Sequence, residues 1–96
     1  TFVILTVQNE KYIMNEFKTE TNDVNGGIQK IYRFPNGYGA SVIRHLGSYG
    51  YEKGLWEVAV LNGAGELDYS TSITEDVLGR LNDPQVDDIL GKISRL

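Results

Sequence analysis

Three acidic residues in the second half of the chain have a spacing that favours a binding surface. Glu57, Glu66 and Asp68 fall in a predicted β-hairpin in which Leu61 pairs with Glu66 across a four-residue loop. Alternate residues of a strand point to the same side, so this pairing places the three carboxylates on one exposed face. Like charges on one face cost folding free energy but complement a basic partner. The pattern predicts a partner-binding surface, and a solvated acidic face is the alternative.

A second group of residues combines positive charge with aromatic rings. Arg33 and Arg44 lie on the two strands of another predicted hairpin, and Tyr38 directly follows its turn. Tyr49 and Tyr51 lie in the glycine-rich stretch that comes next. Arginine binds phosphate through a planar fork, and tyrosine rings stack on bases. The group predicts, as an alternative function, a small-ligand binder such as a protein that sequesters a nucleotide signal. Equally, the arginines can be rim charges and the two loop tyrosines a lid on the core.

The residue types offer little for catalysis. His45 is the only histidine, and Ser41 lies four residues before it on a predicted strand. That spacing corresponds to about 13 Å, too far for a nucleophile and its base. The chain has no cysteine, so thiolate metal sites are excluded, and a lone histidine makes a zinc site unfavourable. Paired carboxylates for glycoside hydrolysis would need a cleft. We therefore expect a protein that is not an enzyme and that holds no metal and no cofactor.

Composition limits the partners further. The chain has 96 residues, a formal net charge of -4 and a pI near 4.8, which argues against direct binding of nucleic acid because such binding needs a basic surface. The apolar run at residues 1–7 is far shorter than the ~20 residues of a membrane span. We expect residues 1–13 to form a strand or an N-terminal extension, and residues 14–96 to form one domain.

The elements that position these side chains are mainly strands. Asn36-Gly37 is typical of a two-residue hairpin turn between residues 28–34 and 39–45. Closing the hairpin there fixes its register. One predicted face then carries Gln29, Ile31, Arg33, Ala40, Val42 and Arg44, and the other carries Ile28, Lys30, Tyr32, Phe34, Gly39, Ser41, Ile43 and His45. Residues 16–21 predict a charged edge strand, and residues 22–27 predict the turn that follows it.

The C-terminal half predicts the core and its cover. In the second hairpin the apolar face consists of Trp56, Val58, Val60, Leu67, Tyr69 and Thr71. A first helix is predicted from Thr74 to Asn82, and a second begins at Asp83-Pro84. The second helix has one apolar stripe: Val86, Ile89, Leu90 and Ile93. The predicted fold class is α+β, with an antiparallel β-meander of four to five strands covered by two short C-terminal helices.

Four segments resemble a group of small uncharacterised proteins encoded by bacteriophages and prophages. They are YRFPNGYGASV at 32–42, GSYG at 47–50, WEVAVL at 56–61 and ITEDV at 73–77. The resemblance spans roughly residues 14–93 and carries over no catalytic residue. It implies a phage accessory protein in the cytoplasm of the infected bacterium, where small acidic phage proteins often inhibit host machinery.

The leading hypothesis joins this resemblance to the acidic residues. It is a non-enzymatic inhibitor, of the anti-CRISPR or another anti-defence type, that binds a host protein with a basic surface through Glu57, Glu66 and Asp68. A small-ligand binder is the second hypothesis. A self-associating structural component, and thus a homo-oligomer, is the third.

Overall fold

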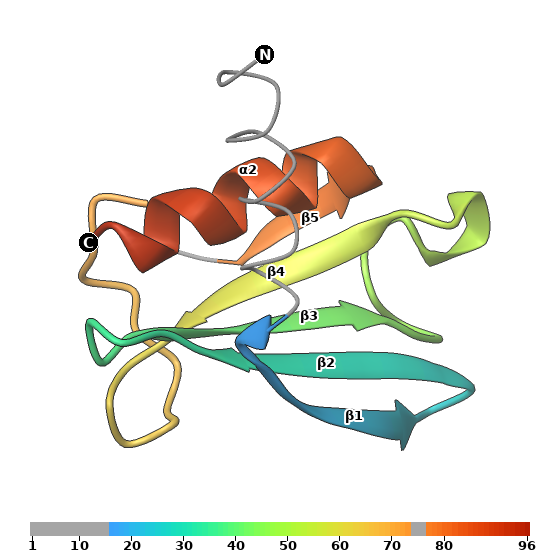
Figure 1. The fold of residues 1–96 in the computed structure, drawn as a ribbon. Helices are drawn as coiled ribbons and strands as arrows, with labels where there is room; N and C mark the ends of the chain where they lie inside the picture. Colours follow the sequence, from blue (N-terminus) through green and yellow to red (C-terminus); the bar gives the residue numbers. More distant parts are fainter. Residues whose placement is uncertain (1–15, 74–76) are drawn as a thin grey trace, which may run out of the picture.

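The computed structural model describes residues 16–73 and 77–96 and has an α+β architecture. The sheet is antiparallel with the strand order β1-β2-β3-β4-β5, a meander in which each strand pairs with the next (Figure 1). The elements are β1 (Lys18–Val24), β2 (Gly27–Arg33), β3 (Gly39–Arg44), the short 3-10 helix η1 (Tyr51–Lys53), β4 (Trp56–Leu61), β5 (Leu78–Leu81) and helix α2 (Asp83–Ser94). The α+β class and the antiparallel meander are confirmed. The prediction for residues 1–13 lies outside the described residues.

A two-residue turn joins β1 to β2. Asn25 and Gly26 both have positive φ, at 43° and 79°, and Val24 pairs with Gly27 across them. These are the conformations of the tight turn whose twist matches paired strands. The predicted edge strand is therefore confirmed but continues to Val24, and the turn is shorter than the predicted 22–27. β1 forms one edge of the sheet, where its charged residues discourage pairing with other chains.

The turn between β2 and β3 has three residues, not the predicted two. The Phe34 N–H donates to the Tyr38 carbonyl at 2.9 Å, and the Gly37 N–H donates to the Phe34 carbonyl at 3.0 Å. A two-residue turn at Asn36-Gly37 would pair Pro35 with Tyr38, and that pair cannot form fully because proline has no N–H to donate. The closing pair moves out to Phe34, and Gly37 takes the positive φ of 91° that this wider turn requires.

This change shifts the hairpin register by one residue. Tyr32 now pairs with Ala40, and Arg33 pairs with Gly39. A one-residue shift moves one strand's side chains to the other face, so the predicted faces were wrong. The face toward α2, called the helix-side face, carries Lys30, Tyr32, Ala40, Val42 and Arg44. Arg33 and Arg44 consequently lie on opposite faces of the sheet.

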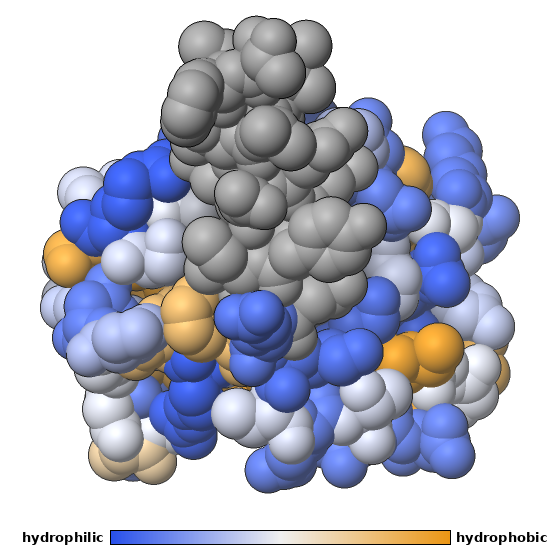
Figure 2. All heavy atoms as spheres, in the orientation of Figure 1, coloured by the Kyte–Doolittle hydropathy of each residue, from blue (hydrophilic) through white to orange (hydrophobic). Residues whose placement is uncertain are grey.

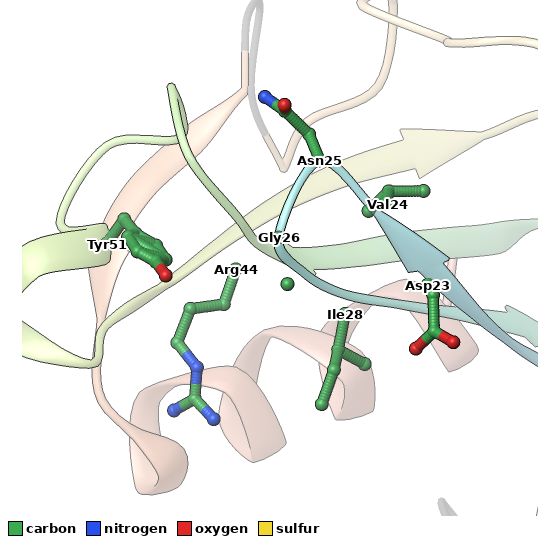
Figure 3. Close-up of a pocket in the computed structure, with 8 residues that line it drawn as sticks. Asp23, Val24, Asn25, Gly26, Ile28, Arg44 and Tyr51 are labelled. Carbon is green, nitrogen blue, oxygen red and sulfur yellow. The ribbon is translucent and has the colours of Figure 1, made fainter.

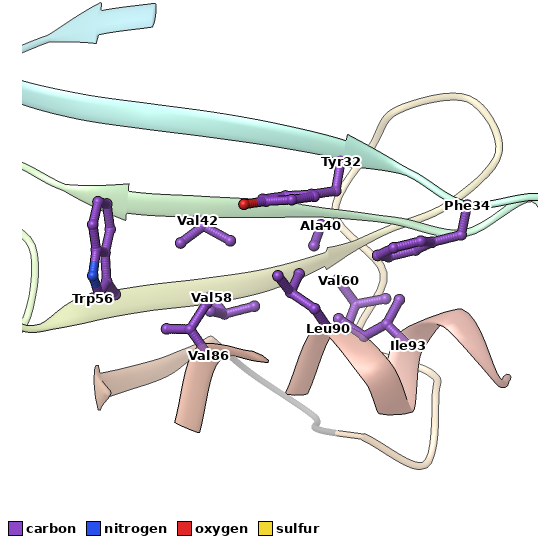
Figure 4. Close-up of a cluster of buried hydrophobic side chains, with 10 residues drawn as sticks. All are labelled: Tyr32, Phe34, Ala40, Val42, Trp56, Val58, Val60, Val86, Leu90 and Ile93. Carbon is purple, nitrogen blue, oxygen red and sulfur yellow. The ribbon is translucent and has the colours of Figure 1, made fainter. Parts of the chain in front are cut away.

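Helix α2 covers the helix-side face over β3 and β4. Asn82 caps the helix by accepting a hydrogen bond from the Gln85 N–H at 2.9 Å, and Pro84 occupies its first turn. Val86, Leu90 and Ile93 are buried against the strands (Figure 4). The predicted stripe is confirmed. The core cluster consists of Tyr32, Phe34, Ala40, Val42, Trp56, Val58, Val60, Val86, Leu90 and Ile93.

The second predicted hairpin forms only in part. β4 lies where the first strand of that hairpin was predicted, and Trp56, Val58 and Val60 are buried. The chain after it meets β4 in one isolated bridge, between Leu61 and Leu67. Leu67 and Tyr69, predicted to lie in the core, remain 52% and 43% exposed. That part of the prediction was wrong.

β5 pairs with the rest of the β4 edge, and its residues belong to a segment that we predicted to be helical. Residues 74–76 of that helix lie outside the described residues, and residues 78–81 form a strand. Its glycine packs on the loop before β4, because an ideal Cβ on Gly79 would lie only 2.8 Å from the Tyr49 Cβ. Tertiary contact thus overrides the local helix signal. Within the described ranges, no helix is long and apolar enough to cross a membrane.

Candidate ligand-binding pocket

A pocket of about 570 Å³ lies beside the β1–β2 turn (Figure 3). Asp23, Ile28 and Arg44 form one cross-strand row, because Asp23 pairs with Ile28 and Ile28 pairs with Arg44. In Figure 3 these three side chains point to the same side of the sheet. Tyr51 of η1 lines the pocket on the side across from the turn. The lining residues are Asp23, Val24, Asn25, Gly26, Gly27, Ile28, Arg44 and Tyr51.

Glycine allows the turn to approach the end of β3 closely. An ideal Cβ on Gly27 would overlap the Arg44 carbonyl oxygen and would lie 2.6 Å from the His45 Cα. The Leu46 N–H donates to the Asn25 carbonyl at 3.1 Å, and this bond joins the turn to the chain that leaves β3. The pocket wall therefore depends on a backbone contact that no larger residue would permit.

Arg44 is held from two sides. Its guanidinium carbon lies 4.2 Å from the centroid of the Trp56 ring, and its Nη1 donates to the Gly54 carbonyl at 3.0 Å. The Trp56 Nε1 in turn donates to the Asp83 Oδ1 at 2.8 Å. The cation–π contact and the hydrogen bond orient the fork without neutralising it. Among the described residues, the only ion pair within 4.0 Å joins Lys92 to Asp88, so Arg44 has no carboxylate at that distance.

The surroundings of Arg44 are cationic. The Nζ of Lys30 lies 4.5 Å from the centroid of the same Trp56 ring. Burial lowers the pKa of Lys30, and the positive charges of Lys18 and Arg44 lower it further, although Asp83 and Asp87 oppose them. In a chain with net charge -4, this is a local concentration of positive charge next to a pocket.

Two glycines at the ends of η1 set the place of Tyr51. Gly50 and Gly54 have φ of 86° and 71°, and the Gly54 N–H donates to the Tyr51 carbonyl at 3.0 Å. An ideal Cβ on Gly50 would lie 2.8 Å from the Leu55 Cβ, so this end of the loop is closely packed. Tyr51 is half-buried, and its hydroxyl end points toward the β1–β2 turn in Figure 3.

The five residues of the predicted ligand site separate into two groups. Arg44 and Tyr51 line the pocket. Arg33 lies on the opposite face, where its Nη1 donates to the Asn62 carbonyl at 3.3 Å. Tyr38 packs at the margin of the core, and Tyr49 is 57% exposed with the Arg80 guanidinium carbon 5.5 Å from its ring centroid.

Sequence reasoning missed part of the pocket lining. Asp23 and Ile28 were not among the predicted residues, although the triplet Asn25-Gly26-Gly27 between them signals a tight turn with close backbone approach. Placing the turn at Asn25 and Gly26, instead of over residues 22–27, would have paired Asp23 with Ile28. Both residues would then have been placed beside Arg44 across the sheet.

The predicted acidic surface loses one of its three members. Glu57 lies on β4, on the face away from α2, and is only 9% exposed. Glu66 is exposed in the loop after β4. Asp68 accepts hydrogen bonds from the Ser70 hydroxyl and the Ser70 N–H, which lower the pKa of its carboxyl. The expectation of three exposed carboxylates is therefore wrong for Glu57, and partner binding by Glu66 and Asp68 stays a prediction.

The residues considered for catalysis have structural contacts. The Ser41 hydroxyl accepts a hydrogen bond from the Gln29 Nε2 at 3.1 Å. The His45 Nδ1 lies 2.7 Å from the Leu46 carbonyl oxygen, and the Ser48 hydroxyl donates to the His45 carbonyl at 2.8 Å. In the part of the chain that the structure describes, no group of three or more His, Asp or Glu side chains could hold a metal ion.

These features define a small α+β domain with a pocket of about 570 Å³ at one end of its antiparallel sheet. Comparison of the chain with protein-family models, with curated proteins and with solved structures found no match. The resemblance to phage proteins therefore stays a prediction.

Proposed function

We propose that this chain is a non-enzymatic binding protein and that its pocket takes a nucleotide-type anion. One observation carries the proposal: three side chains of complementary chemistry follow one another across three neighbouring strands. They are the cation Arg44, the apolar Ile28 and the acid Asp23. The strand spacing puts the Cα atoms of Arg44 and Asp23 roughly 10 Å apart, and no ion pair within 4.0 Å joins the two side chains. A ligand with a phosphate at one end and a base amino group at the other would bind both.

The chemistry of each wall matches one part of such a ligand. The guanidinium of Arg44 offers its fork to phosphate, Tyr51 offers a ring face to a base, and Asp23 accepts from an exocyclic amine. Trp56 and the Gly54 carbonyl hold Arg44 in place before binding, which lowers the entropic cost of ordering it. The volume of about 570 Å³ is within the usual range of about 300–1,000 Å³ for small-molecule sites.

The resemblance to phage proteins suggests a setting for this activity. Within an infected bacterium, a small protein that sequesters a nucleotide signal would act as an anti-defence factor without catalysis. The inhibitor hypothesis that relies on three exposed carboxylates has less support, because Glu57 is buried.

Titration of the protein with nucleotides tests the proposal. The probes are cyclic and linear purine nucleotides, each with the matching nucleoside, measured by thermal shift and isothermal titration calorimetry. We expect at least one nucleotide to raise the Tm and its nucleoside to bind about tenfold or more weakly, since charge-assisted contacts to phosphate are lost. Arg44→Lys should weaken the nucleotide by about 10- to 100-fold, because lysine keeps the charge but not the fork.

The chain provides a matched control for each position. Arg33→Lys changes the other arginine of the hairpin on the opposite face, and Tyr49→Leu changes the tyrosine that packs near Arg80; both should bind like the wild type. Tyr51→Leu and Asp23→Asn should both weaken binding. No Tm shift with any nucleotide, or equal loss in Arg33→Lys and Arg44→Lys, would contradict the proposal.

A further inference from the structure

A closed loop holds the segment that follows β4. The Asn62 N–H donates to the Glu66 carbonyl at 2.8 Å, and the Gly65 N–H donates to the Asn62 carbonyl at 3.0 Å. The Asn62 side chain accepts from the Ala64 and Glu66 N–H groups at 2.9 and 3.1 Å. These bonds fix the position at which the chain leaves the loop and continues into residues 66–70. We call residues 66–70 the loop edge.

The loop edge leaves part of its backbone pointing away from the sheet. The bonds that flank its single bridge run from Asn62 N–H to Glu66 carbonyl and from Asp68 N–H to Val60 carbonyl, the latter at 2.8 Å. In an antiparallel pair, the residue between two such bonds directs its own N–H and C=O outward. Leu67 is that residue. No backbone hydrogen bond joins its N–H or C=O to another described residue.

Acidic and apolar side chains alternate along the loop edge. Leu67 is 52% exposed and Tyr69 is 43% exposed, which makes them two of the five large apolar residues that reach the surface of the described chain. The hydrophobic residues visible in Figure 2 form separate patches on a largely hydrophilic surface. Glu66 precedes Leu67, and Asp68 lies between Leu67 and Tyr69 in the sequence. Neither acid has an ion pair within 4.0 Å among the described residues. Hydrogen bonds from the Ser70 hydroxyl and N–H lower the pKa of the Asp68 carboxyl.

We propose that the loop edge docks an extended, basic segment of another protein, which adds to it as a short β-strand. The outward N–H and C=O of Leu67 provide main-chain bonds to such a segment. Leu67 and Tyr69 provide apolar contact, and Glu66 and Asp68 select lysine or arginine on the partner by charge complementarity. In Figure 1 the loop after β4 and η1 lie at opposite ends of the sheet, so this site is separate from the ligand pocket.

Nuclear magnetic resonance on the full chain tests the proposal. The probe is a blocked nine-residue peptide that alternates valine and lysine, and the control peptide alternates valine and glutamate. We expect the lysine peptide to shift the amide signals of residues 66–70 and to bind at least tenfold more tightly than the glutamate peptide. Binding should weaken as salt rises, because exposed charge pairs are screened.

Charge reversal and matched controls decide between this site and others. Glu66→Lys with Asp68→Lys should reduce binding of the lysine peptide by tenfold or more and should make the glutamate peptide the better ligand. Leu67→Ser should also weaken binding. Glu20→Lys, on the exposed β1 edge, and Arg44→Lys, in the pocket, should leave it unchanged.

Three results would overturn the inference. They are signal shifts confined to β1 or to the pocket, equal affinity for the two peptides, and a homodimer in sedimentation that Leu67→Ser dissociates. The last result would assign the exposed apolar residues to a second copy of this chain.

Discussion

Two turns of this molecule have the same design and different outcomes. Phe34–Tyr38 and Asn62–Glu66 each enclose three residues, each close with the same two backbone hydrogen bonds, and each end on a glycine with positive φ, Gly37 or Gly65. They are also neighbours, since an ideal Cβ on Gly63 would lie 3.6 Å from the Gly37 carbonyl oxygen. After the first turn the strands pair at six positions, whereas after the second they form one bridge.

The phase of the apolar residues explains the difference. After the first turn, Tyr32 pairs with Ala40, so the apolar residues of both strands share the helix-side face. After the second turn, the bridge aligns Leu67 with Leu61, on the face away from α2. Further pairing would bring Asp68 beside Val60 in the core, and burying a carboxylate among apolar side chains is costly. The chain therefore leaves β4, and β5 supplies Leu78 and Leu81 to that edge.

Amide exchange gives the largest expected contrast between the two hairpins. The Val42 amide lies in the central strand and should exchange only through global unfolding. The Ser72 amide would face β4 if the second hairpin continued, but it has no backbone partner among the described residues. We expect exchange at Val42 to be slower by more than about a thousandfold after correction for intrinsic rates. Hydrogen–deuterium exchange read by nuclear magnetic resonance measures both. Comparable protection at Ser72 would mean that the second hairpin extends in solution and that the phase argument fails.

Glycines beside the two turns should differ strongly in their tolerance of alanine. An ideal Cβ on Gly39 would overlap the Tyr32 carbonyl oxygen, whereas a Cβ on Gly63 has only an ordinary contact with the neighbouring turn. We expect Gly39→Ala to lower the free energy of unfolding by about 3 kcal/mol and Gly63→Ala to change it by less than about 0.5 kcal/mol. Urea denaturation of both variants at one pH measures the difference. Equal losses would show that the close approach of Gly39 to the Tyr32 backbone does not cause the destabilisation.

The sequence predicts where strands occur better than how they pair. The alternation of Trp56, Val58 and Val60 predicts β4 because local periodicity carries that information. Register depends on the length of a turn, and one missing N–H, at Pro35, is enough to change it. Both predicted hairpins were displaced by one residue, because each turn closes at a different pair of residues from the predicted one. β5 was missed because its place depends on Tyr49 and on the vacancy along β4, which are contacts distant in sequence.

The candidate site was predictable to the same degree. Residue chemistry indicates Arg44 and Tyr51 as ligand-binding candidates, and these two line one pocket. The same chemistry indicates Arg33, which the register shift places on the opposite face. Asp23 enters the site only through the pairing of β1 with β2, which residue types alone do not reveal. Position in a sheet, rather than residue type, decides membership of the site.

The two positive-φ glycines should show the smaller cost of the turns themselves. Gly37 faces open space, so Gly37→Ala should cost only the left-handed conformation, about 1 kcal/mol. An ideal Cβ on Gly65 would lie 2.5 Å from the Arg33 Nη2, so Gly65→Ala should cost slightly more by displacing that flexible side chain. Gly37→Asn and Gly65→Asn should cost less than the alanine variants, since asparagine tolerates this conformation. Thermal and urea unfolding of the four variants provide the test, and losses above about 3 kcal/mol at Gly37 would contradict it.

The smallest expected effect is an alkaline one in the first hairpin. Burial raises the pKa of Tyr32 above its ordinary 10.0, and the negative charge of Asp87 raises it further. The unfolded chain then loses this proton at lower pH than the folded chain, so Tyr32 contributes stability that is complete below pH 10.0 and is lost as the pH rises through the folded-state value. Urea unfolding of the wild type and Tyr32→Phe from pH 8 to 11 should show a difference in unfolding free energy that is constant up to about pH 10 and then shifts against the wild type. The shift at Lys30 affects both proteins alike and cancels in this difference. A constant difference across the range would place the Tyr32 hydroxyl in water rather than against α2, and the first hairpin would then share the exposure seen at Tyr69 in the second.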